Sequence, residues 1–463
     1  MRTRFPLLDT PAPNLNLEAN LDKAITHYFQ KRAFTLAEIP EYHDMVQEAR
    51  KVRLDTLNSL ETHIRRFLNV LRNAGVRVIE AKSGDDARRA VLDIARRHDV
   101  KRTVKSKSML SEEVCLNGFL EESGIEVVET DLGELIVQLA KEKPSHILTP
   151  CIHKSQREIA ELFSGVFQKN VPDEESAIAE VARAFLREKF FSADMGITGV
   201  NFGVAETGTL AFVENEGNLR YCALLPRVHV ALMGIERLAP DMESLGILLK
   251  VLTLAGTGQL AGAYTTLLSP PGFGRKAPQQ GRFIYLILVD NGRSRLLSDP
   301  RRLETLACIR CGACLNACVV YRHIGGHAYR APYMGPIGAI LMPGIHPTKE
   351  TERLGFFSTL CGACKEICPV GIDIPGQLLA AREQFFSHPA RSPVKGAKYL
   401  AFLLASHIGR HPRVIPLARR LVRFMLAIPY AKRALGWGKV RDVPIPAARS
   451  FQERFLGGPE DTA

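Results

Sequence analysis

The sequence lacks any apolar run long enough to cross a membrane, which takes about 18 residues or more. The stretch that comes closest, Tyr399–Ile408, is short and contains Ser406 and His407. The first residues of the chain are partly basic but include no apolar core of the kind that a signal peptide needs. These absences predict a cytoplasmic protein without a membrane-spanning segment.

Two nucleotide-binding fingerprints are also missing. The sequence has no G-x-G-x-x-G between a predicted strand and a helix, and no G-x-x-x-x-G-K-[ST]. Its 61 lysines and arginines outnumber its 49 aspartates and glutamates, which gives a net charge of +12. No nucleic-acid-reading motif accompanies this charge, so we expect no nucleic-acid partner.

Much of the positive charge lies in the C-terminal region, residues 391–463, which we predict to be helical. Leu417, Leu421, Phe424 and Met425 share one face there, and we expect this face to pack in a core. A solvated surface explains the basic residues, and the alternative is contact with an acidic partner or, peripherally, with a membrane. These basic residues are Arg410, Arg413, Arg419, Arg420, Arg423, Lys432, Arg433 and Lys439.

Seven of the ten cysteines lie in two short runs. The first run reads C-x2-C-x2-C-x3-C, the bacterial ferredoxin spacing, in which three cysteines hold one [4Fe–4S] cube and the fourth reaches another. The second reads C-x2-C-x3-C and is followed by Pro369. Structural zinc prefers paired C-x2-C knuckles, and disulfides suit small secreted domains, so the spacing predicts two iron–sulfur clusters.

The ferredoxin analogy divides the seven cysteines between the two clusters. Cluster 2 then lacks one thiolate. A histidine, Cys222, a small molecule or nothing fills the gap, and an open iron favours conversion to [3Fe–4S]. Val319 replaces the proline that usually ends the first run, with little expected effect. The assignment is Cys308, Cys311, Cys314 and Cys368 for cluster 1, and Cys318, Cys361 and Cys364 for cluster 2; the candidate histidines are His323, His327 and His346.

Hydrophobic periodicity predicts four parts. Residues 1–75 form a helical N-terminal arm. Residues 76–295 alternate strands and helices, as in a mostly parallel α/β sheet, with one short strand expected at Ser145–Thr149. Residues 300–390 form a mostly helical iron–sulfur domain, and the basic helical region follows.

Polar side chains follow several predicted strands of the α/β part. Ligands bind at strand ends in such folds, where lysine, serine and threonine can hold a carboxylate or phosphate. Glu206 is a weak candidate proton acceptor for a 2-hydroxy acid. The alternative is plain turns and solvated lysines. The candidate ligand residues are Lys105, Ser106, Lys107, Thr198, Asn201, Thr207 and Arg220.

The remaining histidines and cysteines carry weaker signals. We expect structural roles for His146, His153 and His229. Cys115 and Cys151 are expected to be buried small side chains, as is Cys222 if it is not the missing ligand. These expectations concern His146, His153, His229, Cys115, Cys151 and Cys222.

Several motifs together resemble the lactate-utilization protein B family: Lys105–Glu113, Gly124–Glu134, Gly196–Phe202, Asn215–Asn218 and the cysteine runs. The resemblance implies a lactate-utilization (LUD) domain with a NagB/RpiA/CoA-transferase-like fold, followed by a ferredoxin-like double-cluster domain with the seven cysteines as ligands. It also implies L-lactate oxidation to pyruvate in a complex with two sister proteins, of the A and C types.

We therefore predict an electron-transfer subunit of an oxidoreductase complex rather than a stand-alone enzyme. Two clusters can divide the two electrons of a hydroxy acid and pass them to a downstream acceptor. One alternative is that the α/β domain itself binds and oxidises a 2-hydroxy acid. Another is a redox-sensing regulator built on an oxygen-labile cluster.

Overall fold

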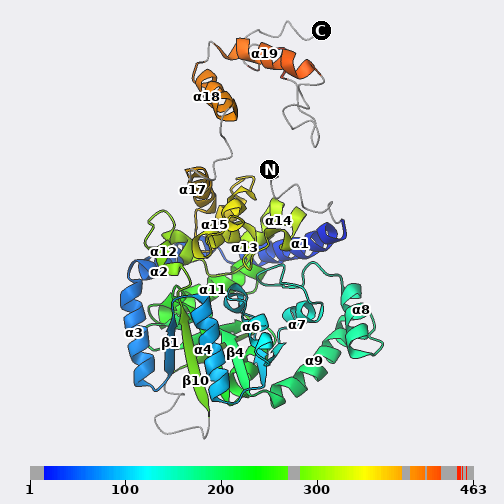
Figure 1. Cartoon of the computed structure of the whole chain (residues 1–463), viewed down its shortest axis with the longest axis vertical. Helices are drawn as coiled ribbons and strands as arrows, with labels where there is room; N and C mark the ends of the chain where they lie inside the picture. Colours follow the sequence, from blue (N-terminus) through cyan, green and yellow to red (C-terminus); the bar gives the residue numbers. More distant parts are fainter. Residues whose placement is uncertain are drawn as a thin grey trace. The chain divides into compact units, whose positions relative to one another are not determined.

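The computed structural model describes residues 15–269, 282–387, 397–411, 414–428, 446–449, 451 and 455. The chain divides into two compact units, Met1–Phe385 and Phe386–Ala463. The first unit combines N-terminal helices, an α/β body and a helical segment that carries the two cysteine runs (Figure 1). The four-part division of the sequence stays a prediction.

Three helices open the described chain. α1 lies beside α14 (Val319–Ile324) of the cysteine segment, although the two are far apart in the sequence (Figure 1). α3 buries Phe67 and Leu71 against the α/β body. Their bounds are Leu15–Ala37 for α1, Tyr42–Asn58 for α2 and Leu60–Asn73 for α3.

A six-stranded sheet forms the centre of the α/β body, with the strand order β1-β10-β7-β4-β2-β3. Every pairing in it is parallel, which confirms the predicted parallel α/β class. Helices cover both faces of such a sheet, so the side chains on both sides of each strand are buried. The strand sequences are therefore nearly continuously apolar. The strands are β1 (Arg77–Ala81), β2 (Arg102–Lys105), β3 (Glu126–Glu129), β4 (Met195–Gly199), β7 (Val228–Gly234) and β10 (Phe283–Val289).

Alternate side chains of β7 enter different cores. Val228, Val230 and Leu232 pack in the cluster that includes α4 (Gly84–Arg97) and α6 (Leu116–Glu122). Ala231 and Met233 pack on the other face, in the core that continues into the cysteine segment. This period of two is the geometry of a strand buried on both faces.

A second sheet of four strands, in the order β8-β5-β6-β9, packs in the same large core as Met233. β6 pairs antiparallel with β5 and β9, and β5 pairs parallel with β8. The strands are β5 (Phe202–Val204), β6 (Leu210–Glu214), β8 (Leu238–Ala239) and β9 (Tyr264–Leu268).

The helices of the α/β body begin and end at residues that suit those positions. Ser83 and Ser155 form capping boxes at the starts of α4 and α8, and α11 ends at Gly258 with φ of 64°. The helices are α4 (Gly84–Arg97), α5 (Met109–Glu113), α6 (Leu116–Glu122), α7 (Leu132–Leu139), α8 (Gln156–Phe167), α9 (Glu175–Ser192), α10 (Asn218–Leu224) and α11 (Met242–Thr257).

The strand predicted at Ser145–Thr149 is wrong, because this segment is a loop. His146 Nδ1 accepts hydrogen bonds from the amides of Leu148 and Thr149, at 3.0 and 3.1 Å, and this curls the chain. Tyr321 donates to the carbonyl of Ser145 at 2.6 Å, so the loop packs on the cysteine segment instead of entering the sheet.

Short helices build the cysteine segment. Its longest buried element is α15, in which every residue is buried, including Pro343. The core of the α/β body runs without a break into this segment, from Phe212 to Leu378. The elements are α12 (Arg293–Leu297), η3 (Leu303–Ala307), α13 (Ala313–Asn316), α14, η4 (His327–Tyr329), α15 (Gly335–Ile345), η5 (Thr351–Phe356), α16 (Ala363–Glu366) and α17 (Ile374–Ser387).

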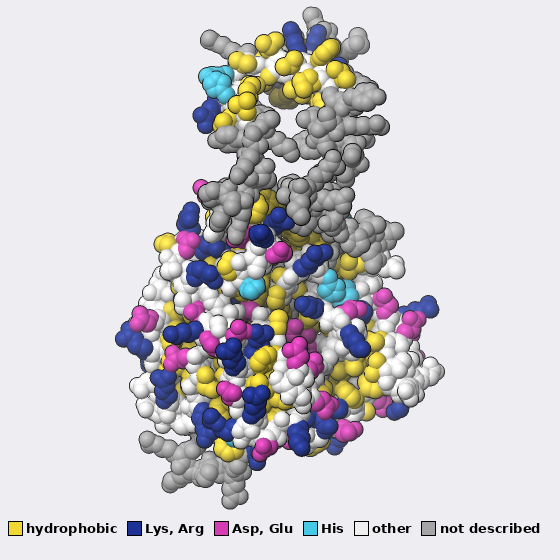
Figure 2. All heavy atoms as spheres, in the orientation of Figure 1, with side chains coloured by type: hydrophobic (Ala, Val, Ile, Leu, Met, Phe, Trp, Pro, Cys, Tyr) yellow, Lys and Arg dark blue, Asp and Glu magenta, His cyan; other side chains and the backbone are white. Residues whose placement is uncertain are grey.

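The second unit contains α18 (Ala397–Gly409) and α19 (Ile415–Ala427). The predicted core packing of α19 is wrong within this unit, because Leu417 and Phe424 are 70% and 68% exposed. Figure 2 shows apolar side chains gathered over both helices. In the described parts of the chain, none of the helices is long and apolar enough to cross a bilayer. Arg413, Lys432, Arg433 and Lys439 lie outside the described residues.

Arg53 of α2 is, with Arg293, one of the two largest fully buried side chains among the described residues. Its guanidinium donates four hydrogen bonds, all to main-chain carbonyls, at 2.7–3.1 Å. Two acceptors, Glu236 and Leu238, belong to the α/β body, and two, Leu306 and Ala307, directly precede the first cysteine run. One side chain therefore joins the N-terminal helices, the α/β body and the cysteine segment.

We expect Arg53→Ala to lower the free energy of unfolding by about 3 kcal/mol or more, because it leaves buried carbonyls without donors. Chemical denaturation of the anaerobic protein measures this. Arg65→Ala removes an arginine that is 72% exposed and is the matched control, with an expected change within about 0.5 kcal/mol. Equal stability of the two variants would contradict the role of Arg53.

Candidate metal centre and adjoining cavity

The seven cysteines of the two runs gather in the helical segment, and none of them forms a disulfide. Six of them are buried, and Cys361 is exposed. Cys314 and Cys364 lie on the short helices α13 and α16, each of which begins after a glycine with positive φ. Gly312 has φ of 74° and Gly362 has φ of 93°, a conformation that favours glycine and lets the chain turn tightly around a ligand.

The first set of thiols meets around Cys314. Burial raises the pKa of the Cys314 thiol, and the nearby Cys308, Cys311 and Cys368 sulfurs raise it further. Burial also raises the pKa of the Cys311 thiol, and the nearby Cys368 and Cys308 sulfurs raise it further. Thiols that destabilise one another's thiolates lie close together, and a bound cation removes this penalty. These four residues are the set predicted for cluster 1.

The second set meets around Cys364. The pKa of the Cys364 thiol is raised to about 12. Burial is the largest cause, and the nearby Cys318 and Cys361 sulfurs raise it further. Burial also raises the pKa of Cys318, with Cys361 as a further cause. Cysteines of the first set do not appear among these causes. The thiols of Cys318, Cys361 and Cys364 therefore lie close enough to affect one another's pKa, and the division of the seven cysteines between two clusters stays a prediction.

Backbone amides point at several of these sulfurs. The amides of Arg310, Tyr321 and Ile372 donate to the sulfurs of Cys308, Cys318 and Cys368 respectively, each at 3.4 Å. Such bonds favour the thiolate form and tune the potentials of iron–sulfur clusters.

The spacing of the sulfurs separates clusters from single metal ions. Thiolates around one zinc, each at about 2.3 Å from the metal, lie roughly 3.8 Å apart. All seven cysteines are among the described residues, and no three of their sulfurs lie within 4.8 Å of one another. A cube spreads its ligands more widely because each thiolate binds a different iron. The donor set therefore fits iron–sulfur clusters better than zinc.

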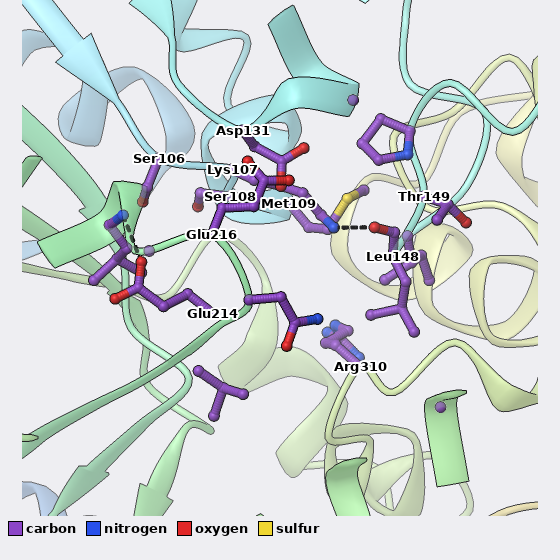
Figure 3. Close-up of a pocket in the computed structure, with 18 of the residues that line it drawn as sticks. Ser106, Lys107, Ser108, Met109, Asp131, Leu148, Thr149, Glu214, Glu216 and Arg310 are labelled. Carbon is purple, nitrogen blue, oxygen red and sulfur yellow. Dashed lines mark hydrogen bonds between the residues drawn. The ribbon is translucent and has the colours of Figure 1, made fainter. Parts of the chain in front are cut away.

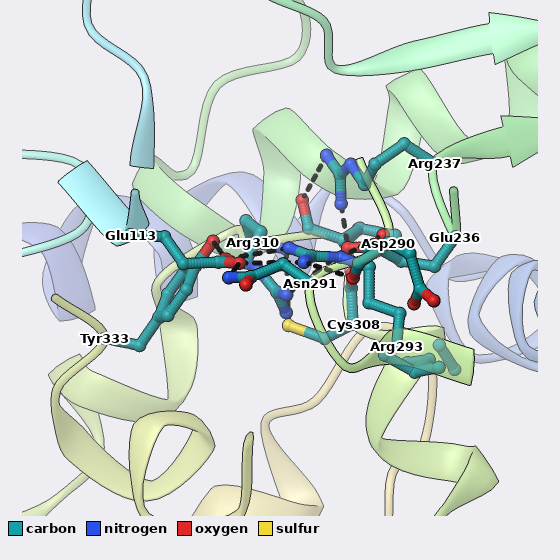
Figure 4. Close-up of polar contacts among 12 residues, drawn as sticks. Glu113, Glu236, Arg237, Asp290, Asn291, Arg293, Cys308, Arg310 and Tyr333 are labelled. Atoms are coloured by element: carbon teal, nitrogen blue, oxygen red, sulfur yellow. Dashed lines mark hydrogen bonds and ion pairs between the residues drawn. The ribbon is translucent and has the colours of Figure 1, made fainter. Parts of the chain in front are cut away.

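Buried charges surround the start of the first run (Figure 4). Arg293 donates to both carboxylate oxygens of Glu113 at 2.8 Å and to Glu236 at 2.6 Å. Four guanidinium groups face two carboxylates here, so positive charge is in excess. A cube held by four thiolates is a net anion and balances such an excess. The group comprises Arg53, Arg237, Arg293, Arg310, Glu113 and Glu236.

Arg310 has a buried guanidinium with free donors. Its side chain is 10% exposed, and its two terminal nitrogens make no hydrogen bond. It lies over the ring of Tyr333 and forms an ion pair with Glu236 at 3.5 Å. Burial lowers the pKa of Arg310, but Cys308, Tyr333 and Glu236 offset this and raise it overall. The side chain therefore stays charged and can bind an anion.

A cavity of about 900 Å³ lies where the α/β body meets the cysteine segment (Figure 3). Lys107, Asp131 and Asn201 line it from the carboxyl ends of β2, β3 and β4, and Arg310 lines it from the cluster side. Ligands bind at this edge in open α/β sheets, and the volume falls within the roughly 300–1,000 Å³ of ligand sites. The cavity is therefore a candidate site for a small ligand, which would lie beside the start of the first cysteine run.

Glu216 is a titratable residue in the wall of the cavity. It reaches solvent through the opening, but the protein around it and the neighbouring Asp131 raise its pKa to about 7. Its carboxylate accepts a hydrogen bond from the amide of Leu132 at 3.1 Å. The charge of the cavity therefore changes near neutral pH.

Three of the predicted ligand residues, Ser106, Lys107 and Asn201, line the cavity. The others pair elsewhere. Lys105 is buried with its ammonium 2.7 Å from Glu129, and Thr198 bonds to His229 in the sheet. Thr207 bonds to Thr209, Arg220 pairs with Glu214 and lies over Tyr264, and Glu206 pairs with Arg66 on the surface. The sequence analysis missed Arg310, Glu113, Glu236 and Arg293.

The residues considered for the open position of cluster 2 have other partners or face solvent. His323 pairs with Glu18 at 2.7 Å, and His327 bonds to the carbonyl of Lys143 at 2.7 Å. His346 is exposed. Cys222 is buried beneath the sheet, 3.3 Å from the hydroxyl of Thr130.

The other histidines have the structural roles expected of them. Burial lowers the pKa of His146 to about 3, and this neutral ring bonds to Asn316 of α13. His153 bonds to Ser145, and His229 is buried. Burial of Cys222 is confirmed, Cys151 is partly buried, and burial of Cys115 is wrong. Cys115 adopts a positive φ of 51° between α5 and α6.

Two known protein families match the chain, one over the α/β body and the other over the cysteine segment. Residues 64–291 match the LUD domain family, and residues 304–372 match the 4Fe-4S dicluster domain family. Lactate utilization protein B 1 of Bacillus mycoides (strain KBAB4) is 38% identical over 435 residues, which are 92% of this chain and 89% of that protein. The chain belongs to the lactate utilization protein B family. The resemblance read from the sequence is thereby confirmed.

Other lactate utilization B proteins match over similar lengths. The protein of Oceanobacillus iheyensis is 35% identical over 460 residues, 95% of each chain. Lactate utilization protein B 2 of Bacillus mycoides is 34% identical and covers 94% of this chain and 93% of its own. A crystal structure of a DUF162 family protein from Deinococcus radiodurans covers 50% of this chain and 98% of its own, at 12% identity. Its TM-score of 0.29 is too low to support an argument.

We expect Arg310→Met to lower the reduction potential of cluster 1, because it removes a buried positive charge that stabilises the reduced cluster. The change is on the order of 100 mV for a charge several ångströms away at an effective dielectric constant near 20. Redox titration followed by EPR measures it. Arg77→Met, at the opposite end of the sheet, is the control and should leave the potential unchanged. Equal potentials in both variants would refute the electrostatic role.

Proposed function

We propose that this chain is the iron–sulfur electron-transfer subunit of a complex that oxidises L-lactate to pyruvate. In this proposal two [4Fe–4S] clusters supply one-electron transfer from the hydroxy acid to a downstream acceptor. The names of the similar proteins and the 4Fe-4S dicluster domain support a role in lactate utilization with iron–sulfur binding. The observation that carries the proposal is the gathering of the seven cysteines of the two runs in one helical segment, where six of them are buried.

The protein residues contribute by position and charge. Cys308 lies beside Arg310, which also lines the cavity, so one residue connects a bound anion with the first set of thiols. The second set includes the exposed Cys361, which suits electron exit to another protein. Electrons would enter on the buried side and leave on the exposed side.

A second candidate function is that the cavity itself holds the 2-hydroxy acid. The free nitrogens of Arg310 favour it, because a buried guanidinium binds a carboxylate through two hydrogen bonds. Lys107 adds a second cation on the opposite wall, where it bonds to the carbonyl of Leu148. In this case the chain binds substrate as well as carrying electrons.

Finer assignments belong to the same proposal. The α/β body takes the NagB/RpiA/CoA-transferase-like fold, and the cysteine segment is ferredoxin-like. The partners are two sister proteins of the A and C types in the cytoplasm. The exposed apolar side chains and the arginines of α18 and α19 form the surface that contacts a partner protein or, peripherally, a membrane.

Iron and sulfide content together with EPR test the proposal on protein purified without oxygen. We expect about eight irons per chain, two cubes of four, with signals that appear on reduction. Zinc in place of iron would refute the electron-transfer role. Calorimetry with L-lactate then tests the cavity: binding that is lost in Arg310→Met and kept in Arg77→Met supports the second function, and absent binding leaves the substrate site to a partner.

If the cavity binds a small carboxylate, we expect affinity to fall as the pH rises through about 7. Glu216 is neutral below its raised pKa and negative above it, so deprotonation adds repulsion. One added charge costs about 1 kcal/mol in a solvated cavity, or roughly five-fold in affinity. Glu216→Gln should bind equally at pH 6 and 8, and Glu243→Gln, outside the cavity, should keep the pH dependence. Unchanged pH dependence in Glu216→Gln would rule out this role.

A further inference from the structure

The two cysteine runs are an internal repeat with a constant offset. Cys361, Cys364 and Cys368 each lie 50 positions after Cys311, Cys314 and Cys318, and the Gly-Ala pair between the first two cysteines recurs as well. The same offset carries the remaining first-run ligand, Cys308, onto Ser358. The position that cluster 2 lacks is therefore occupied by serine.

The backbone repeats along with the sequence. Arg310 and Leu360, which precede the second cysteine position, both have positive φ, at 64° and 59°. The helix α13 over residues 313–316 recurs as α16 over residues 363–366, and 3₁₀ helices precede both Cys308 and Ser358. Non-glycine residues rarely adopt positive φ, so its recurrence at the same point marks a shared loop conformation.

Contacts of Ser358 reproduce those of Cys308. The amide of Arg310 donates to Cys308 Sγ at 3.4 Å, and the amide of Leu360 donates to Ser358 Oγ at 3.0 Å. The Ser358 oxygen therefore takes the place in its loop that a ligand sulfur takes in the other.

An arginine holds the carbonyl of each of these residues. Arg237 donates to the carbonyl of Cys308 at 3.0 Å, and Arg382 donates to that of Ser358 at 2.8 Å. Arg382 also bonds to the carbonyl of Gly355 at 2.8 Å, which fixes the approach to Ser358. Both loops are thus clamped from outside at the same point.

The division of the cysteines between the two sets leaves the fourth ligand position of the second set for Ser358. In the first set, three positions of the first run combine with Cys368 of the second run. By the repeat, the second set combines Cys361 and Cys364 with Cys318 of the first run, and its missing member is Ser358. The sequence alternatives His323, His327 and Cys222 are paired elsewhere.

We propose that Ser358 Oγ is the fourth protein ligand of the second cluster. This rests on the proposed binding of that cluster by Cys318, Cys361 and Cys364. Ligation forms one iron–oxygen bond and releases the hydroxyl proton to solvent, with no change of oxidation state. Ser358 is only partly buried and Cys361 is exposed, so water can accept the proton. An alkoxide is a harder donor than a thiolate, so it favours the oxidised iron and lowers the potential of the cluster.

Iron content, Mössbauer spectra and EPR of the full chain, purified without oxygen and then oxidised mildly with ferricyanide, test the ligand. We expect wild type and Thr359→Ala, an exposed neighbour, to keep four irons in the second cluster. Ser358→Ala should lose one iron and show a [3Fe–4S] signal. Ser358→Cys should keep four irons at a less negative potential. An unchanged first-cluster signal in each variant reports correct folding.

Either of two results would overturn the assignment: Ser358→Ala with the iron content and spectra of wild type, or a wild-type protein that already shows [3Fe–4S] before oxidation. Failure of the underlying cluster proposal looks different, because Cys361→Ala would then contain as much iron as wild type.

The reciprocal exchange adds an independent test. Cys308→Ser should keep four irons in the first cluster at a more negative potential, whereas Cys308→Ala should lose one. Loss of iron in Cys308→Ser equal to that in Cys308→Ala would count against serine as a ligand at this loop position.

Discussion

The rest of the structure depends on buried guanidinium groups that bind main-chain carbonyls at the start of the first cysteine run. Arg53 holds Leu306 and Ala307, and Arg237 holds Cys308. A buried arginine needs its hydrogen bonds satisfied, so each contact fixes the loop against the α/β body. The cysteine run is thereby an extension of the body's core rather than a module on a flexible linker.

Because of these contacts, the two repeated cysteine loops lie in different surroundings. The first loop lies under the α/β body, among buried arginines and glutamates and beside the cavity. The second carries the exposed Cys361 and is held by Arg382 of α17. One local sequence pattern therefore sits in two electrostatic environments, which is how a protein gives two similar clusters different potentials. In the proposed electron-transfer role, this difference in packing would give the path its direction.

Much of the fold was predictable because burial leaves a periodic trace. The parallel sheet was read correctly from apolar strands that alternate with helices, as at β7 and β10. The prediction of a strand at Ser145–Thr149 is wrong because Ile147 and Leu148 pack on the cysteine segment, and a local sequence pattern does not report such a contact. Exposure of Leu417 and Phe424 was missed for a similar reason: an amphipathic face does not say what covers it.

The sequence by itself determined the ligand chemistry, since C-x2-C-x2-C spacing forces three thiolates into one tight loop. It also held the repeat that carries Cys308 onto Ser358. Only the tertiary structure decided what surrounds those loops. Arg310, Glu113 and Glu236 come from separate parts of the chain and meet only after the strands of the sheet align their carboxyl ends. Long-range packing sets their distances, and electrostatic energy depends on distance, so spacing along the chain could not reveal them.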